Sequence, residues 1–270
     1  MRLLIVHAHP EPSSFNAAMT RQAVEALQGS GQEVVVSDLY ATRFDPVSDR
    51  RNFTGAKDRS RFSQQVEEAH ASATDGYVAA LQTEMDRVAW CTDLVLQFPL
   101  WWLGMPAILK GWVDRVFAVG RAYGGGRRFT TGVFAGKRAM CAITVGGSSA
   151  EYAECGFYRS MDSVLFPIHR GILGFVGFTV LEPFVVFGPQ RMRHEERVAE
   201  LARYRERVLH LASGLPLSLG LEASRRSSQP RCSSRMHASF PIHGKQAHAE
   251  SERWHCGCFV TRAVTIEMLT

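Results

Sequence analysis

Two tryptophans between two prolines are the first feature of this chain that suggests chemistry. The stretch FPLWWLGMP (98–106) follows an apolar run and precedes residues with helical spacing. Prolines stiffen a loop, and the flat ring of a tryptophan gives an aromatic ligand a surface on which to stack. Trp102 can supply such a wall while the other tryptophan packs inward. Ordinary core packing of both rings is the alternative interpretation.

A second stretch, HPEPSSFN (9–16), carries short polar side chains at the start of a predicted helix. Ser14 is in position to cap this helix, whose free N–H groups and dipole attract an anion, most often a phosphate. His9 and Asn16 add further hydrogen-bonding groups. The stretch lacks the glycine spacing of a Rossmann or P-loop fingerprint, so a purely structural cap is the alternative.

A third stretch, GGSSAEY (146–152), places two glycines directly after an apolar run. Glycines let backbone N–H groups approach a ligand closely, although a tight turn alone would also use them.

Strand and helix patterns alternate through most of the chain and must position these three stretches. The predicted strands are 3–8, 33–40, 94–98, 138–145 and 179–187. The predicted helices are 14–31, 77–91, 106–117, 192–211 and, in part, 161–177. The polar stretch 42–76 shows no strong period.

This alternation predicts an α/β fold, a flavodoxin-like doubly wound parallel sheet of five strands in the order 2-1-3-4-5 with helices on both faces. Ligands bind such a sheet beyond the carboxyl ends of its strands, where the strand order reverses. The loops after the first, third and fourth strands therefore converge. A phosphate loop, an aromatic loop and a glycine loop together favour a flavin.

The composition predicts one large domain with an appendage. Hydrophobic residues make up 46% and charged residues 21% of 270 residues, which is ordinary for a globular protein. The domain is assigned to 1–213, and 214–270, rich in Ser, His and Arg, is interpreted as a flexible or weakly ordered extension. The extension carries most of the net charge of +5, so the nearly neutral domain gives no support to nucleic-acid binding.

The longest apolar stretch, 94–109, is interrupted by Gln, Pro and Gly and is too short for a membrane span. The N-terminus lacks the features of a signal peptide, so a cytoplasmic protein is expected.

Six cysteines do not pair by their spacing and are expected to be reduced thiols. Near the C-terminus, His255, Cys256 and Cys258 are residue types that bind zinc. Their spacing matches no standard zinc finger, so no metal site is predicted.

Five motifs together resemble the NAD(P)H:quinone oxidoreductase (DT-diaphorase) family. They are HPEPSSFNAAM, SDLYA, LQFPLWWLGMPAILKGWVDRVF, TVGGSSAEY and GILGFVGFTVLEP, and the similarity runs over 2–211. The resemblance implies a homodimeric flavoprotein with FAD rather than FMN. NADH or NADPH would deliver hydride to the flavin N5 and leave, and a quinone would then take two electrons in a ping-pong cycle.

The resemblance also implies site residues by position. The flavin phosphates and ribityl chain would be held by His9, Ser14, Phe15, Asn16 and Ala17, and Arg197 would reach the pyrophosphate or adenine. The isoalloxazine would be lined by Pro99, Leu100, Trp102, Leu103, Thr144, Val145, Gly146, Gly147 and Tyr152. The substrate pocket, at the dimer interface in the family, would be formed by Trp102, Tyr123, Gly125 and Phe175.

Three positions depart from the family pattern. Leu103 replaces a frequent phenylalanine, and Gly125 replaces a second pocket tyrosine, which widens the pocket mouth. Tyr158 stands where DT-diaphorase has a histidine. Tyr152 and Tyr158 are the candidate catalytic residues, because each can donate a hydrogen bond to the charge on reduced flavin. A phenol cannot become cationic as an imidazole can, so a weaker proton relay is expected.

Three other interpretations stay open at this stage. The chain resembles flavoproteins that regulate potassium-efflux systems, although no docking motif is evident. A non-enzymatic flavodoxin-type carrier is disfavoured by the slightly basic domain and the HPEP loop. Finally, the unusual C-terminus could compromise dimer or adenine contacts.

Overall fold

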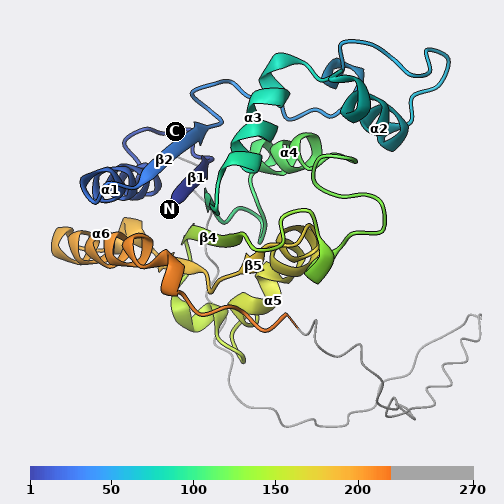
Figure 1. Cartoon of the computed structure of the whole chain (residues 1–270). Coiled ribbons are helices and arrows are strands. Elements are labelled where there is room, and N and C mark those ends of the chain that lie inside the picture. Colours follow the sequence, from blue (N-terminus) through green and yellow to red (C-terminus); the bar gives the residue numbers. More distant parts are fainter. Residues whose placement is uncertain (220–270) are drawn as a thin grey trace, which may run out of the picture. The chain divides into compact units, whose positions relative to one another are not determined.

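A parallel sheet with helices on both faces organises the chain (Figure 1). The computed structural model describes residues 1–219. The strands are β1 (Arg2–His7), β2 (Glu33–Asp38), β3 (Asp93–Pro99), β4 (Arg138–Val145), β5 (Thr179–Val180) and β6 (Phe184–Phe187). Their order is β2-β1-β3-β4-β5, with β6 also paired to β4. The predicted flavodoxin-like topology is confirmed.

The last strand differs from its prediction. The stretch 179–187 forms two short strands instead of one, because Pro183 between them has no N–H for the sheet. Both run parallel to β4. On its outer side, β5 is covered by the end of the described chain, where the Leu217 N–H donates to the Val180 carbonyl at 2.8 Å.

The α-helices are α1 (Phe15–Gly29), α2 (Gln64–Thr74), α3 (Ala79–Trp90), α4 (Ala107–Val116), α5 (Met161–Phe166) and α6 (His194–Leu209). The short helices are η1 (Arg50–Asn52), η2 (Phe129–Thr131), η3 (Ser149–Tyr152), the π-helix η4 (Pro167–Gly174), η5 (Pro189–Arg191) and η6 (Leu211–Ser213). Figure 1 shows α6 beside α1, while α3 and α4 pair elsewhere on the sheet.

The alternation of side chains along β1 explains why both faces are covered. Leu3 and Ile5 belong to the core with α1 and α6, whereas Leu4 and Val6 belong to the core with α3 and α4. All four are fully buried. Successive strand residues point to opposite faces, so a continuous apolar run requires a helix layer on each side.

One helix, α2, lies in the stretch 42–76 where the sequence showed no strong period. Its buried residues are Glu67, Glu68 and Ala71. The Glu67 carboxylate accepts hydrogen bonds from the N–H groups of Lys57 and Asp58. Because two carboxylates occupy the buried face, an apolar helical period is missing although the helix is present.

Among the described residues, no helix combines the length and apolar character needed to cross a membrane. Residues 220–270, which include His255, Cys256 and Cys258, lie outside the described part of the chain, so the predictions for them stay predictions.

Candidate active site at the carboxyl ends of the central strands

A cavity of about 540 Å³ lies beyond the carboxyl ends of β1, β3 and β4. It is lined by His9, Glu11, Ser14, Phe15, Asn16, Pro99, Leu100, Trp101, Thr144, Val145, Gly146, Pro189 and Gln190. The three loops singled out in the sequence thus meet, as the reversal of strand order at β1 and β3 requires. A fourth loop, after β6, joins them.

The first turn of α1 presents unpaired donors to this cavity. Ser14 caps the helix, its hydroxyl accepting from the Ala17 N–H at 3.1 Å. In the described residues, the N–H groups of Phe15 and Asn16 have no hydrogen-bond partner. His9 accepts from the Glu11 N–H through Nδ1 at 3.0 Å, which leaves its proton on Nε2. Partial burial lowers the pKa of His9, so this ring is a neutral donor.

Asn16 contributes an unsatisfied acceptor. Its side chain is almost completely buried, and Nδ2 donates to the Thr144 hydroxyl at 3.2 Å. Its Oδ1 has no partner in the described part of the chain. Buried polar atoms are rarely left unpaired, so this oxygen indicates a ligand donor in the cavity.

The two tryptophans of the middle loop have different places. Trp101 lines the cavity, whereas the Trp102 side chain is fully exposed and does not. Trp101 and Gly104 exchange backbone hydrogen bonds of 3.1 and 2.9 Å around a tight turn. The central residues Trp102 and Leu103 both have positive φ, +51° and +57°. Side chains with a Cβ rarely adopt this conformation, so the turn stores strain beside the cavity.

In the glycine loop (146–152), the Tyr152 side chain limits the space at one glycine but not at the other. A Cβ at Gly146 would meet nothing within 4 Å, whereas one at Gly147 would lie 2.9 Å from the Tyr152 ring. The Gly146 carbonyl accepts from the Arg191 guanidinium at 2.6 Å. Arg191 therefore ties the loop after β6 to the loop after β4.

The two candidate catalytic tyrosines stack on each other. Their ring centroids are 4.9 Å apart with an interplanar angle of 27°. The Tyr158 N–H donates to the Glu151 carbonyl at 2.9 Å, which holds the chain for this stack. Burial, together with the neighbouring Tyr158, raises the pKa of Tyr152, so the Tyr152 hydroxyl remains a proton donor near neutral pH.

Several sequence-predicted residues do not line this cavity. The predicted residues that are not in its wall are Ala17, Trp102, Leu103, Gly147, Tyr152, Tyr158 and Arg197. Arg197 is half-buried in the first turns of α6 and donates to the Met192 carbonyl at 2.8 Å.

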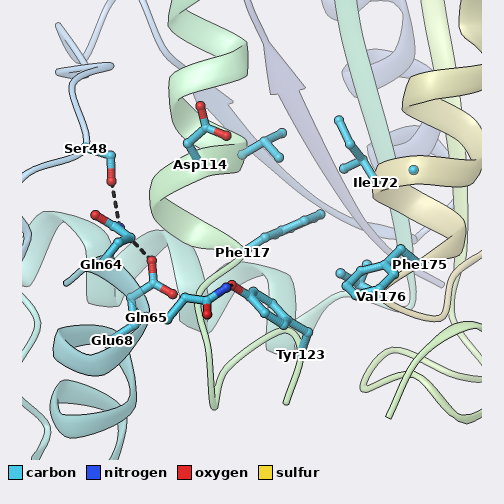
Figure 2. Close-up of a pocket in the computed structure, with 12 residues that line it drawn as sticks. Ser48, Gln64, Gln65, Glu68, Asp114, Phe117, Tyr123, Ile172, Phe175 and Val176 are labelled. Carbon is cyan, nitrogen blue, oxygen red and sulfur yellow. Dashed lines mark hydrogen bonds between the residues drawn. The ribbon is translucent and has the colours of Figure 1, made fainter. Parts of the chain in front are cut away.

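The predicted substrate residues Tyr123 and Phe175 line a different cavity of about 480 Å³ (Figure 2). Their ring centroids are 5.9 Å apart, in an edge-to-face arrangement. This second cavity shares no lining residue with the first. Gly125 has a φ of +60° in the adjoining loop and is not part of its wall.

The second cavity has a polar side that the sequence did not reveal. Gln64 of α2 donates to the Ser48 hydroxyl at 2.8 Å and to the Glu68 carboxylate at 2.6 Å (Figure 2). Burial raises the pKa of Glu68. Gln65 approaches the Tyr123 hydroxyl at 3.5 Å. Gln64, Gln65 and Glu68 lie on α2, and the sequence did not predict this helix because it has no apolar period.

The sequence also missed Glu11, Trp101, Pro189 and Gln190 in the first cavity. A usable signal existed for the last two. They follow the strand next to β4 and therefore emerge at the same edge of a parallel sheet.

Comparisons with known proteins agree with this geometry. A family model described as flavodoxin-like fold matches residues 1–208. The chain is 43% identical to NAD(P)H dehydrogenase [quinone] 1 of Cavia porcellus over 80% of this chain and 79% of the relative. It is 37% identical to ribosyldihydronicotinamide dehydrogenase [quinone] of Mus musculus over 77% of this chain and 90% of the relative.

A crystal structure from Klebsiella pneumoniae, provisionally described as a quinone reductase, superposes with a TM-score of 0.78 at 37% identity. The match covers 80% of this chain and 86% of that one. With both the sequence match and the shared fold over the whole site, the chain belongs to the NAD(P)H:quinone oxidoreductase family of flavodoxin-like oxidoreductases.

Proposed function

We propose that this protein is an FAD-dependent NAD(P)H:quinone oxidoreductase that reduces quinones by two electrons. The observation that carries the proposal is the cavity at the reversal of strand order, where an anion site, an aromatic loop and a glycine loop meet. Family membership supplies the reaction class, and the cavity supplies a place for a flavin.

The residues of the cavity fit a flavin. The free N–H groups of Phe15 and Asn16 suit a phosphate at a helix N-terminus. The unpaired Asn16 Oδ1 suits a hydroxyl of a ribityl chain, and the open space at Gly146 suits a ring edge. FAD is preferred to FMN on the resemblance to the family.

A bound flavin would supply hydride transfer at its N5, from NADH or NADPH to a quinone in a ping-pong cycle. The chain holds the ring with Pro99, Leu100 and Trp101 and excludes water from one side. Tyr152 and Tyr158, stacked beside the glycine loop, would donate hydrogen bonds toward the negative charge that a bound flavin acquires.

We also propose a homodimer in which Tyr123 and Phe175 of one subunit complete the substrate pocket of the other. Two observations support it. These rings lie in a cavity separate from the flavin cavity, and Trp102 beside the flavin cavity is fully exposed. A partner subunit that covers the Trp102 side chain would explain why this aromatic ring is exposed in a single chain. Residues 1–213 would be the catalytic domain and 214–270 an extension, in a cytoplasmic enzyme.

The test is a stopped-flow absorbance experiment on the full-length protein reconstituted with FAD. We expect NADH or NADPH to bleach the flavin band and menadione to restore it fully. Dihydronicotinamide riboside, the donor that the mouse relative's name indicates, is run as a third donor. A protein that binds no flavin would refute the proposal. A bound flavin that none of the three donors reduces would favour a carrier or regulatory role instead.

A further inference from the structure

A buried polar cluster lies under the phosphate-binding turn of α1. It consists of His7, Thr20, Gln97 and Tyr204, which we call the Gln97 cluster. His7 and Gln97 pair with each other in the register of β1 and β3, near the carboxyl ends of these strands. Tyr204 comes from α6.

The position of Gln97 is unexpected for a strand buried on both faces. The preceding residue on the same face, Val95, is fully buried and apolar, as is its neighbour Ile5 on β1. Gln97 is itself completely buried. A buried amide stabilises a fold only when its partners are present, so an apolar residue would fill this place with less risk.

The Gln97 amide makes three hydrogen bonds, using both of its N–H donors and one of the two acceptor sites of its oxygen. Nε2 donates to the Asn16 carbonyl at 2.6 Å and to the Thr20 hydroxyl at 2.5 Å. Oε1 accepts from the Tyr204 hydroxyl at 2.8 Å. Because a carbonyl oxygen can only accept, the Asn16 contact fixes which way the amide is turned.

The cluster continues through Thr20 to β1. The Thr20 hydroxyl, which accepts from Gln97, also forms a hydrogen bond with His7 Nδ1 at 3.0 Å. Burial lowers the pKa of His7 to about 4, so the ring in this cluster is neutral. One amide thus joins β3, α1 and α6, and through Thr20 also β1.

The contact with Asn16 connects this cluster to the cavity. Asn16 lies in the first turn of α1, with a free N–H, and its unpaired Oδ1 belongs to the side chain that lines the cavity. A displacement of the Asn16 backbone would move both groups, together with the adjacent Phe15 N–H. The hydrogen bond from Gln97 therefore acts on the anion-binding turn, whereas the aromatic loop is held separately by Pro99 and by the turn at Trp101.

We propose that Gln97 is a positioning residue that sets the first turn of α1 for the flavin phosphate, an inference that rests on the flavin site proposed above. It acts through the Asn16 carbonyl and touches neither cofactor nor substrate. Removing it weakens binding of the phosphate more than binding of the ring.

The experiment compares FMN with riboflavin, which lacks the phosphate. Full-length protein freed of flavin is titrated with each, and dissociation constants are read from the quenching of flavin fluorescence. The variants are Gln97→Leu, which removes the amide at similar volume, and Tyr204→Phe, which removes only the hydroxyl that holds Oε1. Val95→Ala, on the same strand and face, is the matched control for a general loss of packing.

In the wild type, the ratio of the riboflavin to the FMN dissociation constant measures what the phosphate contributes. We expect this ratio to fall about tenfold in Gln97→Leu, as expected for one misplaced charge-assisted hydrogen bond. It should fall less in Tyr204→Phe and stay unchanged in Val95→Ala.

An unchanged ratio in a folded Gln97→Leu, or an equal fall in Val95→Ala, would overturn the inference. If Gln97→Leu does not fold, Tyr204→Phe decides by the same ratio. Wild-type protein that binds none of FMN, riboflavin and FAD would refute the proposed function itself and the inference with it. Wild-type protein that binds FAD but not FMN would show that the turn holds no terminal phosphate and would overturn the inference alone. FMN binding without reduction by a nicotinamide would refute the activity and leave the role of Gln97 standing.

Discussion

At the scale of single residues, the proposed site depends on neutral hydrogen-bond donors and acceptors. Partial burial favours the neutral form of His9, and burial raises the pKa of Tyr152, which keeps that phenol uncharged near neutral pH. The free N–H groups of α1 and the Arg191 contact with the glycine loop supply the positive potential. The substitution of a tyrosine for the family's histidine at Tyr158 thus leaves a donor in place and removes a chargeable group.

Tyr152→Phe should lower the rate of flavin reduction about tenfold, because one donor to a developing negative charge is worth about 1–3 kcal/mol. The flavin dissociation constant should change little, since the ring that packs beside Gly147 is kept. Stopped-flow reduction rates and fluorescence titrations measure the two quantities. Tyr158→Phe is the matched comparison in the same stack, and equal rates in Tyr152→Phe and wild type would exclude a catalytic hydroxyl.

Two buried histidines make stability depend on pH. Burial lowers the pKa values of His7 and His169 to about 4, from 6.5 in the unfolded chain. The unfolded state therefore binds more protons between these values, and stability falls as pH decreases from 6.5 toward 4. Each ring contributes about 3 kcal/mol to this loss at most. The urea midpoint, measured across this range, should fall accordingly.

His169→Leu separates the two contributions. His169 Nε2 has no partner in the described part of the chain, so an apolar replacement leaves no new unpaired group there. The variant should show a clearly shallower dependence of the urea midpoint on pH. If the dependence were as steep as in the wild type, the pKa of His169 would not differ between the folded and unfolded states.

At the scale of elements, loops hold the site and strand ends position the loops. The turn between Trp101 and Gly104 is the most strained part of this arrangement, because Trp102 and Leu103 both have positive φ. Residues with a positive φ fit neither a strand nor a right-handed helix. Strain of this kind persists where the surrounding structure maintains it, and it concentrates at functional sites.

Replacing Trp102 by asparagine and Leu103 by glycine in one variant should stabilise the isolated fold by about 1 kcal/mol, because both tolerate positive φ. The same change removes an exposed aromatic ring, so turnover of quinone should fall while thermal stability rises. Differential scanning fluorimetry and steady-state kinetics measure the two effects. A loss of stability would show that the Trp102 and Leu103 side chains make contacts that outweigh the strain.

The chain segment that covers the β5 edge of the sheet leads to a second prediction. Leu215 and Leu217 pair with the chain around β5, through bonds of 3.3 Å to Glu182 and 2.8 Å to Val180. A chain ending at 213 should expose this edge and unfold at lower temperature than a chain ending at 219. Equal melting temperatures would support the boundary at 213. A lower value for the shorter chain would move the boundary of the catalytic domain to 219.

At the scale of the whole molecule, the proposed active site needs two subunits. The flavin cavity and the Tyr123 cavity have no residue in common in one chain, yet the proposed reaction requires a flavin face and a quinone pocket in contact. The proposed symmetric dimer would resolve this, because it would bring the pocket of each subunit to the flavin of the other.

Complementation between inactive subunits tests the dimer. Asn16→Leu disables the flavin cavity, and a double variant with Tyr123→Ala and Phe175→Ala disables the pocket. After denaturation and joint refolding in equal amounts, each mixed dimer has one intact site. The mixture should recover about a quarter of wild-type activity. The mass of the refolded species is measured to show that dimers, of twice the 30.1 kDa chain mass, have formed. If dimers form and activity does not recover, both cavities act within one subunit.

The sequence by itself determined the topology and the location of the first cavity. Continuous apolar strands such as LLIVHA require helices on both faces, and the order of strands then fixes which loops meet. His9, Ser14, Asn16, Pro99 and Gly146 were found in this way, Thr144 was implied by the family resemblance, and all six line the cavity. Local pattern suffices there because the carboxyl ends of parallel strands share one edge.

Only the tertiary structure decided which tryptophan faces the cavity, that α2 exists, and that the Gln97 amide joins three elements. Each depends on interactions between residues far apart in the chain. Trp101 and Trp102 differ only in the backbone conformation of a turn, and α2 buries carboxylates that distant N–H groups satisfy. A lone glutamine in an apolar strand gives no indication of its partners, because Asn16, Thr20 and Tyr204 reach it only after the sheet has formed.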